Sequence, residues 1–207
     1  TQTMSRVLLV RHGETRWNHE RRIQGWAPTQ LNARGRKQAS ALGRALSEEY
    51  GVNALVSSDL PRASETAAEI NESLGIEIEF DSRFRERDFG FCQGLTYEEF
   101  SERFPQLSTA RSGTAAVDAR PESGETIREM AERVRAGWDE VVSRTGDGET
   151  TVVVTHGGPL YTLLGRFKGL DLAESIADQT QDNCTVNEID VTEDSRIVRE
   201  NDTALRK

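Results

Sequence analysis

Two apolar segments of this chain are each followed closely by a histidine and a glycine. Val7–Val10 is followed by Arg11-His12-Gly13, and Thr151–Thr155 is followed by His156-Gly157-Gly158. Short runs rich in Val and Leu are typical of strands that are buried in a parallel sheet. Because the carboxyl ends of parallel strands meet at one edge, we expect the imidazoles of His12 and His156 to lie on that edge together. Only three histidines occur in the chain, so this placement restricts the fold considerably.

Other strand-like runs alternate with amphipathic helical stretches. Asn32 is a suitable cap for one helix, with Gly51 as its stop, and Pro61 suits the first turn of another. This alternation predicts an α/β fold, with a mostly parallel central sheet flanked by helices on both faces. The expected helices are 32–50, 61–74 and 125–144, and the other expected strands are Ala54–Ser57, Ile76–Phe80 and Thr185–Val191.

The length of 207 residues is that of one domain, 1–207. Within it, 83–122 has the weakest pattern: a short helix over Thr96–Phe104 and then a small polar stretch, Ser108–Ala119. We expect this segment to be a surface excursion that forms a lid over the carboxyl ends of the strands, where α/β proteins place their sites.

Composition limits the partners. The net charge is −9, which argues against binding to nucleic acid or to an anionic membrane. No apolar run approaches the roughly 20 residues that span a bilayer, and the N-terminus lacks the apolar core of a signal peptide. The two cysteines show no metal-type spacing, which suits a reducing cytoplasm. No heptad pattern fixes an oligomeric state, so a monomer and a homodimer both stay open.

A third strand adds a cation to the histidine edge. Ser57-Ser58-Asp59-Leu60-Pro61-Arg62 places Arg62 at a helix start, where a helix N-terminus and a guanidinium both favour phosphate. A single histidine or arginine at such a position is usually structural, and the combination is what indicates chemistry. The spacings of a zinc site, of a serine-hydrolase elbow and of a P-loop are all missing from the sequence. An imidazole that attacks an arginine-bound phosphorus is the interpretation that remains.

The segment Arg11-His12-Gly13-Glu14-Thr15-Arg16-Trp17-Asn18 resembles the signature of the histidine phosphatase superfamily, which includes the cofactor-dependent phosphoglycerate mutases. The resemblance continues in the segments 57–67, 85–90, 123–126 and 154–158, in family order. It implies a phosphoglycerate mutase-like three-layer sandwich.

By this resemblance His12 becomes phosphohistidine, while Arg11, Arg62 and His156 hold the phosphoryl oxygens and Glu86 acts as general acid and base. The second nitrogen of His12 should then donate to a backbone carbonyl. No metal and no cofactor are implied, except 2,3-bisphosphoglycerate as a primer if the protein is a mutase. The substrate would be a small phosphate ester, such as a phosphosugar or phosphoglycerate. Further substrate- or phosphate-binding candidates are Asn18, Thr15, Gln24, Gly25, Arg87 and Gly157.

The choice between phosphatase and mutase depends on the segment before His156. Family mutases carry a longer, basic insertion there, whereas Glu86 and His156 are only 70 positions apart and Ser108–Ala119 is nearly neutral. This departure favours hydrolysis. A catalytically silent member that binds phosphorylated ligands is the alternative of another class.

Residues 90–99 are similar to the fructose-2,6-bisphosphatase branch, but the only candidates for a second phosphate are Arg87, Arg111 and Arg120. Alternatively, Trp26, Phe89, Phe91 and Tyr97 line an apolar substrate pocket or simply pack between lid and sheet.

Overall fold

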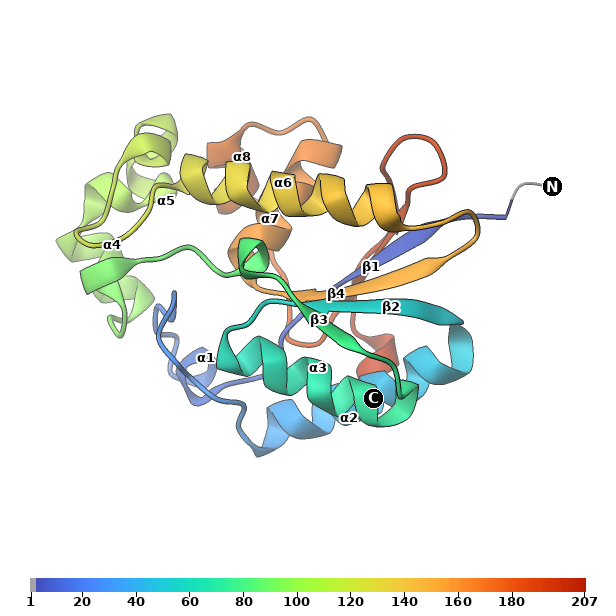
Figure 1. Cartoon of the computed structure of the whole chain (residues 1–207). Helices are drawn as coiled ribbons and strands as arrows, with labels where there is room; N and C mark the ends of the chain where they lie inside the picture. Colours follow the sequence, from blue (N-terminus) through green and yellow to red (C-terminus); the bar gives the residue numbers. More distant parts are fainter. Residues whose placement is uncertain (1–2) are drawn as a thin grey trace.

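A six-stranded sheet runs through the centre of the protein, and helices cover both of its faces (Figure 1). The computed structural model describes residues 3–207. The strand order is β3-β2-β4-β1-β5-β6. The strands are β1 (Arg6–Arg11), β2 (Val52–Ser57), β3 (Ile78–Phe80), β4 (Thr150–Thr155), β5 (Val186–Asp190) and β6 (Arg196–Asp202).

The parallel part of the sheet confirms the expected α/β class. β4 lies between β1 and β2 and is parallel to both, and Arg11 at the end of β1 is opposite Thr155 at the end of β4. β3 is shorter than the expected Ile76–Phe80, because only Ile78–Phe80 pairs with β2. The antiparallel strand β6 was not expected. Its residues alternate between half-buried and exposed at the sheet edge, so it has no apolar run.

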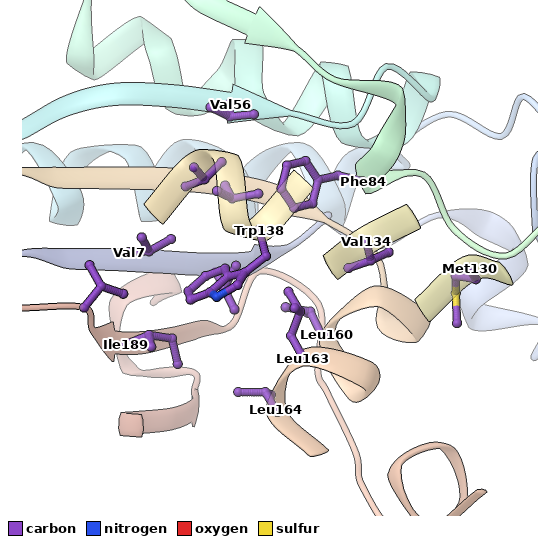
Figure 2. Close-up of a cluster of buried hydrophobic side chains, with 14 of the residues drawn as sticks. Val7, Val56, Phe84, Met130, Val134, Trp138, Leu160, Leu163, Leu164 and Ile189 are labelled. Carbon is purple, nitrogen blue, oxygen red and sulfur yellow. The ribbon is translucent and has the colours of Figure 1, made fainter. Parts of the chain in front are cut away.

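Helices α2 (Ala33–Glu49) and α3 (Pro61–Leu74) cover one face of the sheet, and α6 (Ile127–Arg144), α7 (Gly157–Phe167) and α8 (Leu172–Ala177) lie on the other (Figure 1). Alternate residues of β1 serve the two faces, as the pleat of a strand requires. Leu8 and Val10 belong to the core under α2 and α3, whereas Val7 and Leu9 belong to the core that includes Trp138 of α6 (Figure 2).

The helix ends follow the sequence signals with one exception. Asn32 caps α2, since its side chain accepts a hydrogen bond from the Gly35 amide at 2.8 Å, and Pro61 is the first residue of α3. Gly51 does not stop α2, because the helix already ends at Glu49 and Tyr50 has extended backbone angles.

Segment 83–122 lies beyond the carboxyl ends of the strands (Figure 1). The expected helix over Thr96–Phe104 is α4, which begins after the capping residue Thr96. The stretch Ser108–Ala119 differs from the expected polar excursion, because it is helical and buries Ala116 and Val117. The short helices of the chain are α1 (Arg16–His19), α4 (Tyr97–Arg103) and α5 (Thr109–Ser112), with 3-10 turns η1 (Ser82–Phe84), η2 (Gly90–Cys92), η3 (Pro105–Leu107), η4 (Gly113–Asp118) and η5 (Ala204–Arg206).

Candidate active site

His12 follows directly after β1 and is buried. Its ring Nδ1 is 2.8 Å from the carbonyl oxygen of Gly13. A carbonyl oxygen can only accept, so Nδ1 carries the ring proton and Nε2 holds a lone pair. A Cβ atom on Gly13 would lie 2.6 Å from the Gly35 carbonyl oxygen. Close packing against α2 therefore requires a glycine at this position.

His156 lies beside His12, as the matching strand ends predict. The two ring centroids are 5.1 Å apart, and His156 is fully buried. Its Nε2 is 2.7 Å from the hydroxyl oxygen of Ser58, which follows β2. The sequence interpretation did not select Ser58 as a site residue. The available signal was its position directly after a third parallel strand, at the same edge as both histidines.

Arg62, near the start of α3, is buried and hydrogen-bonded to a neighbouring loop. Its guanidinium donates to the carbonyl oxygens of Gly25 at 2.7 Å and Ala27 at 3.2 Å. Arg11, the last residue of β1, donates to the carbonyl oxygen of Gln181. These carbonyls fix the direction of both guanidinium groups.

Several buried nitrogens around His12 have no hydrogen-bond partner. Four such side-chain atoms occur within residues 3–207, and three of them are Nε of Arg11, Nε of Arg62 and Nδ1 of His156. Buried donors are nearly always paired in proteins, so a group of unpaired ones requires an explanation. A tetrahedral oxyanion beside His12 would supply acceptors for donors of this kind.

The surroundings keep both imidazoles neutral. Burial lowers the pKa of His12 well below its ordinary value, and the nearby positive charges of Arg62 and Arg11 lower it further. The pKa of His156 is lowered for the same reasons, with burial again the largest cause. Burial also lowers the pKa of Arg62 to about 10, so this guanidinium stays charged at neutral pH. The result is a neutral nucleophile beside fixed positive charge.

Glu86 faces the same site from segment 83–122. One carboxylate oxygen accepts from the amide of Arg87 at 2.8 Å, and the other accepts from the amide of Gly158 in the first turn of α7 at 3.2 Å. A Cβ atom on Gly158 would lie 2.2 Å from a carboxylate oxygen of Glu86. The glycine thus lets the carboxylate approach the N-terminus of α7.

A cavity of about 480 Å³ is lined by His12, Arg11, Arg62 and Glu86, whereas His156 is not among its lining residues. Of the predicted substrate-binding residues, Gln24, Gly25, Arg87 and Gly157 also line it. We call the part lined by Arg11, His12, Arg62 and Gly157 the basic end. The large apolar side chains of the remaining lining, which we call the apolar wall, are Ile23, Phe89, Phe100, Leu107, Ile127, Met130 and Ile176, and Tyr97 and Tyr161 also line the cavity.

Other predicted residues lie outside the cavity lining. Thr15 caps α1 in a reciprocal pair with Asn18, and its hydroxyl donates to the side chain of Gln24 at 2.7 Å. These two residues therefore support the loop that carries Gln24. Among the aromatic candidates, Trp26 and Phe91 do not line the cavity, and neither do Arg111 and Arg120.

Within residues 3–207, no three His, Cys, Asp or Glu side chains are grouped as metal ligands would be. No helix in that range is both long enough and apolar enough to cross a membrane.

A mostly parallel sheet with two histidines and two arginines near its carboxyl edge is an arrangement suited to a phosphoryl-transfer protein. The model of the histidine phosphatase superfamily, branch 1, matches residues 7–203, and the chain belongs to this superfamily. It is 40% identical to phosphoglycerate mutase-like protein 4 of Arabidopsis thaliana over 166 residues, which cover 78% of this chain and 70% of that protein.

Solved structures agree with this fold. Bacillus stearothermophilus YhfR is 31% identical with a TM-score of 0.84, covering 98% of this chain and 99% of that chain. A mycobacterial glucosyl-3-phosphoglycerate phosphatase in complex with VO3 is 28% identical with a TM-score of 0.78, covering 93% of this chain and 96% of that chain. The expected phosphoglycerate mutase-like fold is therefore confirmed.

Proposed function

We propose that this protein is a phosphomonoester hydrolase that works through a phosphohistidine at Nε2 of His12. The observation that carries the proposal is the hydrogen bond from Nδ1 of His12 to the Gly13 carbonyl oxygen, because it leaves Nε2 with a lone pair beside the basic end. The lowered pKa of His12 keeps that lone pair available at neutral pH. Arg11 and Arg62 face the equatorial oxygens, on which charge develops.

The reaction has two steps. First, Nε2 of His12 forms a bond to phosphorus as the bond to the leaving oxygen breaks, and Glu86 gives its proton to that oxygen. Second, water attacks the phosphorus of phosphohistidine, Glu86 takes the proton from the water, and the P–N bond breaks to release phosphate. Both steps use the same carboxylate, whose two oxygens are held by the amides of Arg87 and Gly158.

His156 acts as a donor to the phosphoryl group in this proposal. The Ser58 hydroxyl accepts from the Leu60 amide at 3.3 Å and can donate to Nε2 of His156 at 2.7 Å. With Nε2 as an acceptor, the ring proton is on Nδ1, the atom without a partner. Gly157 adds the N-terminus of α7, which favours an anion.

The apolar wall supports a substrate with one phosphate and an uncharged, partly apolar leaving group. Beyond the basic end, Arg87 is the one arginine among the described residues that line the cavity. Its Nε donates to the Glu125 carbonyl oxygen and its Nη2 to that of Ala119, and its guanidinium stacks on Phe89 with 4.9 Å to the ring centroid. A second phosphate or a carboxylate would therefore find few free donors there.

The apolar wall also favours hydrolysis over a mutase reaction, because a mutase must rebind a charged phosphoglycerate. The deciding experiment incubates the protein with 3-phosphoglycerate and catalytic 2,3-bisphosphoglycerate, and in parallel with phenyl phosphate. We expect phosphate release from phenyl phosphate to be the fastest reaction. Formation of 2-phosphoglycerate that outruns phosphate release would identify a mutase instead.

The intermediate has its own test. Brief exposure to a radiolabelled phosphomonoester should give protein-bound phosphate that is labile in acid and stable in base, and His12→Gln should abolish it. A lack of label in the native protein, together with no hydrolysis across a panel of phosphate esters, would leave the silent phosphate-binding member as the better interpretation.

Three further features belong to this proposal. The positive charges of the basic end serve in place of a metal, so EDTA should leave the rate of hydrolysis unchanged. Loss of activity in EDTA, with recovery on adding zinc or magnesium, would contradict this.

Segment 83–122 acts as a lid, which is supported by the place of Phe89, Phe100 and Leu107 in the apolar wall. A cytoplasmic location is supported by two buried, unpaired cysteines, Cys92 and Cys184.

A further inference from the structure

Glu86 belongs to a stretch that has no regular structure of its own. It lies between η1, which ends at Phe84, and η2, which begins at Gly90. The carbonyl groups of such a stretch find no partners in a helix or a sheet ladder, so other groups must bind them if it is to hold one conformation. The position of the Glu86 carboxylate therefore depends on which groups bind these carbonyls.

Arg133, on α6, binds two carbonyl groups of this stretch and one of η1, and Trp26 Nε1 also donates to the Glu86 carbonyl oxygen at 2.7 Å. Its Nη1 donates to the carbonyl oxygens of Arg83 at 2.8 Å and Arg85 at 3.0 Å, and its Nη2 donates to that of Glu86 at 3.2 Å. The same Nη2 also pairs with the carboxylate of Glu125. One planar guanidinium thus holds three carbonyl groups at and just before the proposed acid and base.

Glu125 completes the arrangement on the other side of Glu86. Its carboxylate accepts from the amide of Asp88 at 3.1 Å, and its own amide donates to the Asp88 carbonyl oxygen at 2.9 Å. The side chains of Arg133 and Glu125 are only 20% and 17% exposed, so their charges are poorly screened by solvent. The pair therefore fixes the chain on both sides of Glu86.

We propose that Arg133 is a positioning residue for Glu86, through which it controls proton delivery to the leaving group. The proposal rests on the proposed function, because it assumes that Glu86 protonates the leaving oxygen. A displacement of about 1 Å at a catalytic group can cost on the order of 100-fold in rate. Arg133 is absent from the cavity lining, so the positioning effect proposed for it passes through the main chain of Glu86.

The leaving group distinguishes this role from a general structural one. Phenolate is a poor leaving group and needs the proton from Glu86, whereas 2,4-dinitrophenolate leaves without one. The experiment measures kcat/KM, which reports the step up to phosphohistidine formation, for phenyl phosphate and 2,4-dinitrophenyl phosphate. The variants are Arg133→Met, Arg133→Lys and the control Arg144→Met, which removes another paired arginine of α6.

For Arg133→Met we expect about a tenfold or larger loss with phenyl phosphate and less than about a threefold loss with the dinitrophenyl ester. Arg133→Lys should also lose more kcat/KM with phenyl phosphate than with the dinitrophenyl ester, but to a smaller degree, since an ammonium cannot bind all the carbonyls. Arg144→Met should change neither rate. If Arg133→Met does not fold, the lysine variant carries the test by the ratio of its two rates.

A double variant gives an independent readout. When Glu86→Gln has already removed the acid, adding Arg133→Met should cause almost no further loss with phenyl phosphate. Equal losses for both substrates in the single variant, or losses that multiply in the double variant, would overturn the proposal. If the native protein hydrolyses neither ester, the proposed function fails instead, so the two failures are distinguishable.

Discussion

The two buried histidines at the sheet edge should make the stability of the protein fall in mildly acidic solution. His12 and His156 have pKa values well below the ordinary value of 6.5 in the folded protein, because burial and nearby arginines disfavour the imidazolium. In the unfolded chain the same rings bind protons near pH 6.5. The unfolded state therefore holds more protons below that pH, and the free energy of unfolding decreases as the pH falls.

The size of the effect follows from proton linkage. A histidine that stays neutral in the folded protein down to pH 5 costs about 2 kcal/mol of stability between pH 8 and pH 5, at about 1.4 kcal/mol per pH unit below 6.5, so two such histidines cost about 4 kcal/mol. Carboxylates whose pKa is lowered in the folded protein, such as Asp81 with an ordinary pKa of 3.8, change the stability mainly at lower pH. The window from pH 5 to 6.5 therefore reports the histidines.

Urea unfolding measured from pH 5 to 8, in buffers without phosphate or sulfate, tests this. Anions are left out because binding at the basic end would stabilise the folded state. The variant His12→Gln should lose about half of the pH dependence, and His12→Gln with His156→Gln should lose nearly all of it. The exposed residue His19 offers the matched control, since His19→Gln should keep the full slope. A native protein equally stable at pH 5 and pH 8, or a double variant that keeps the slope, would refute the reasoning.

Three further predictions concern single contacts. Ser58→Ala should lower kcat/KM about tenfold with little change in Tm, because it removes the 2.7 Å hydrogen bond that orients His156. Ser58→Thr should restore much of the rate, and full activity in the alanine variant would contradict this role. Gly158→Ala should cut kcat/KM by on the order of 100-fold, since its Cβ would lie 2.2 Å from the Glu86 carboxylate, whereas Gly51→Ala, which meets nothing within 4 Å, should leave activity unchanged. Thr126→Ala should cost about 1 kcal/mol in the free energy of unfolding, measured by urea denaturation, because it removes the capping box of α6; an unchanged midpoint would show that the cap contributes nothing.

Local signals in the sequence were sufficient for much of the fold. The buried strands, the helix capped by Asn32 and the helix that begins at Pro61 were predicted close to their observed bounds, because apolar periodicity and helix-start residues act over a few positions. The edge strand β6 escaped prediction, since three of its seven side chains are exposed and it has no apolar run. The helical character of Ser108–Ala119 was also missed, because packing of Ala116 and Val117 decides it.

The active site likewise has features that the sequence predicted and features that only the tertiary structure shows. The sequence by itself determined that His12 and His156 would share one edge, because each follows a buried strand directly and the carboxyl ends of parallel strands meet at one edge of a sheet. It also indicated Arg62, through its place at a helix start. Only the tertiary structure decided which nitrogen of His12 is free, that Ser58 contacts His156, and that Arg133 holds the chain at Glu86. These contacts join residues from separate elements, and their geometry depends on how the helices pack on the sheet, which no local pattern encodes.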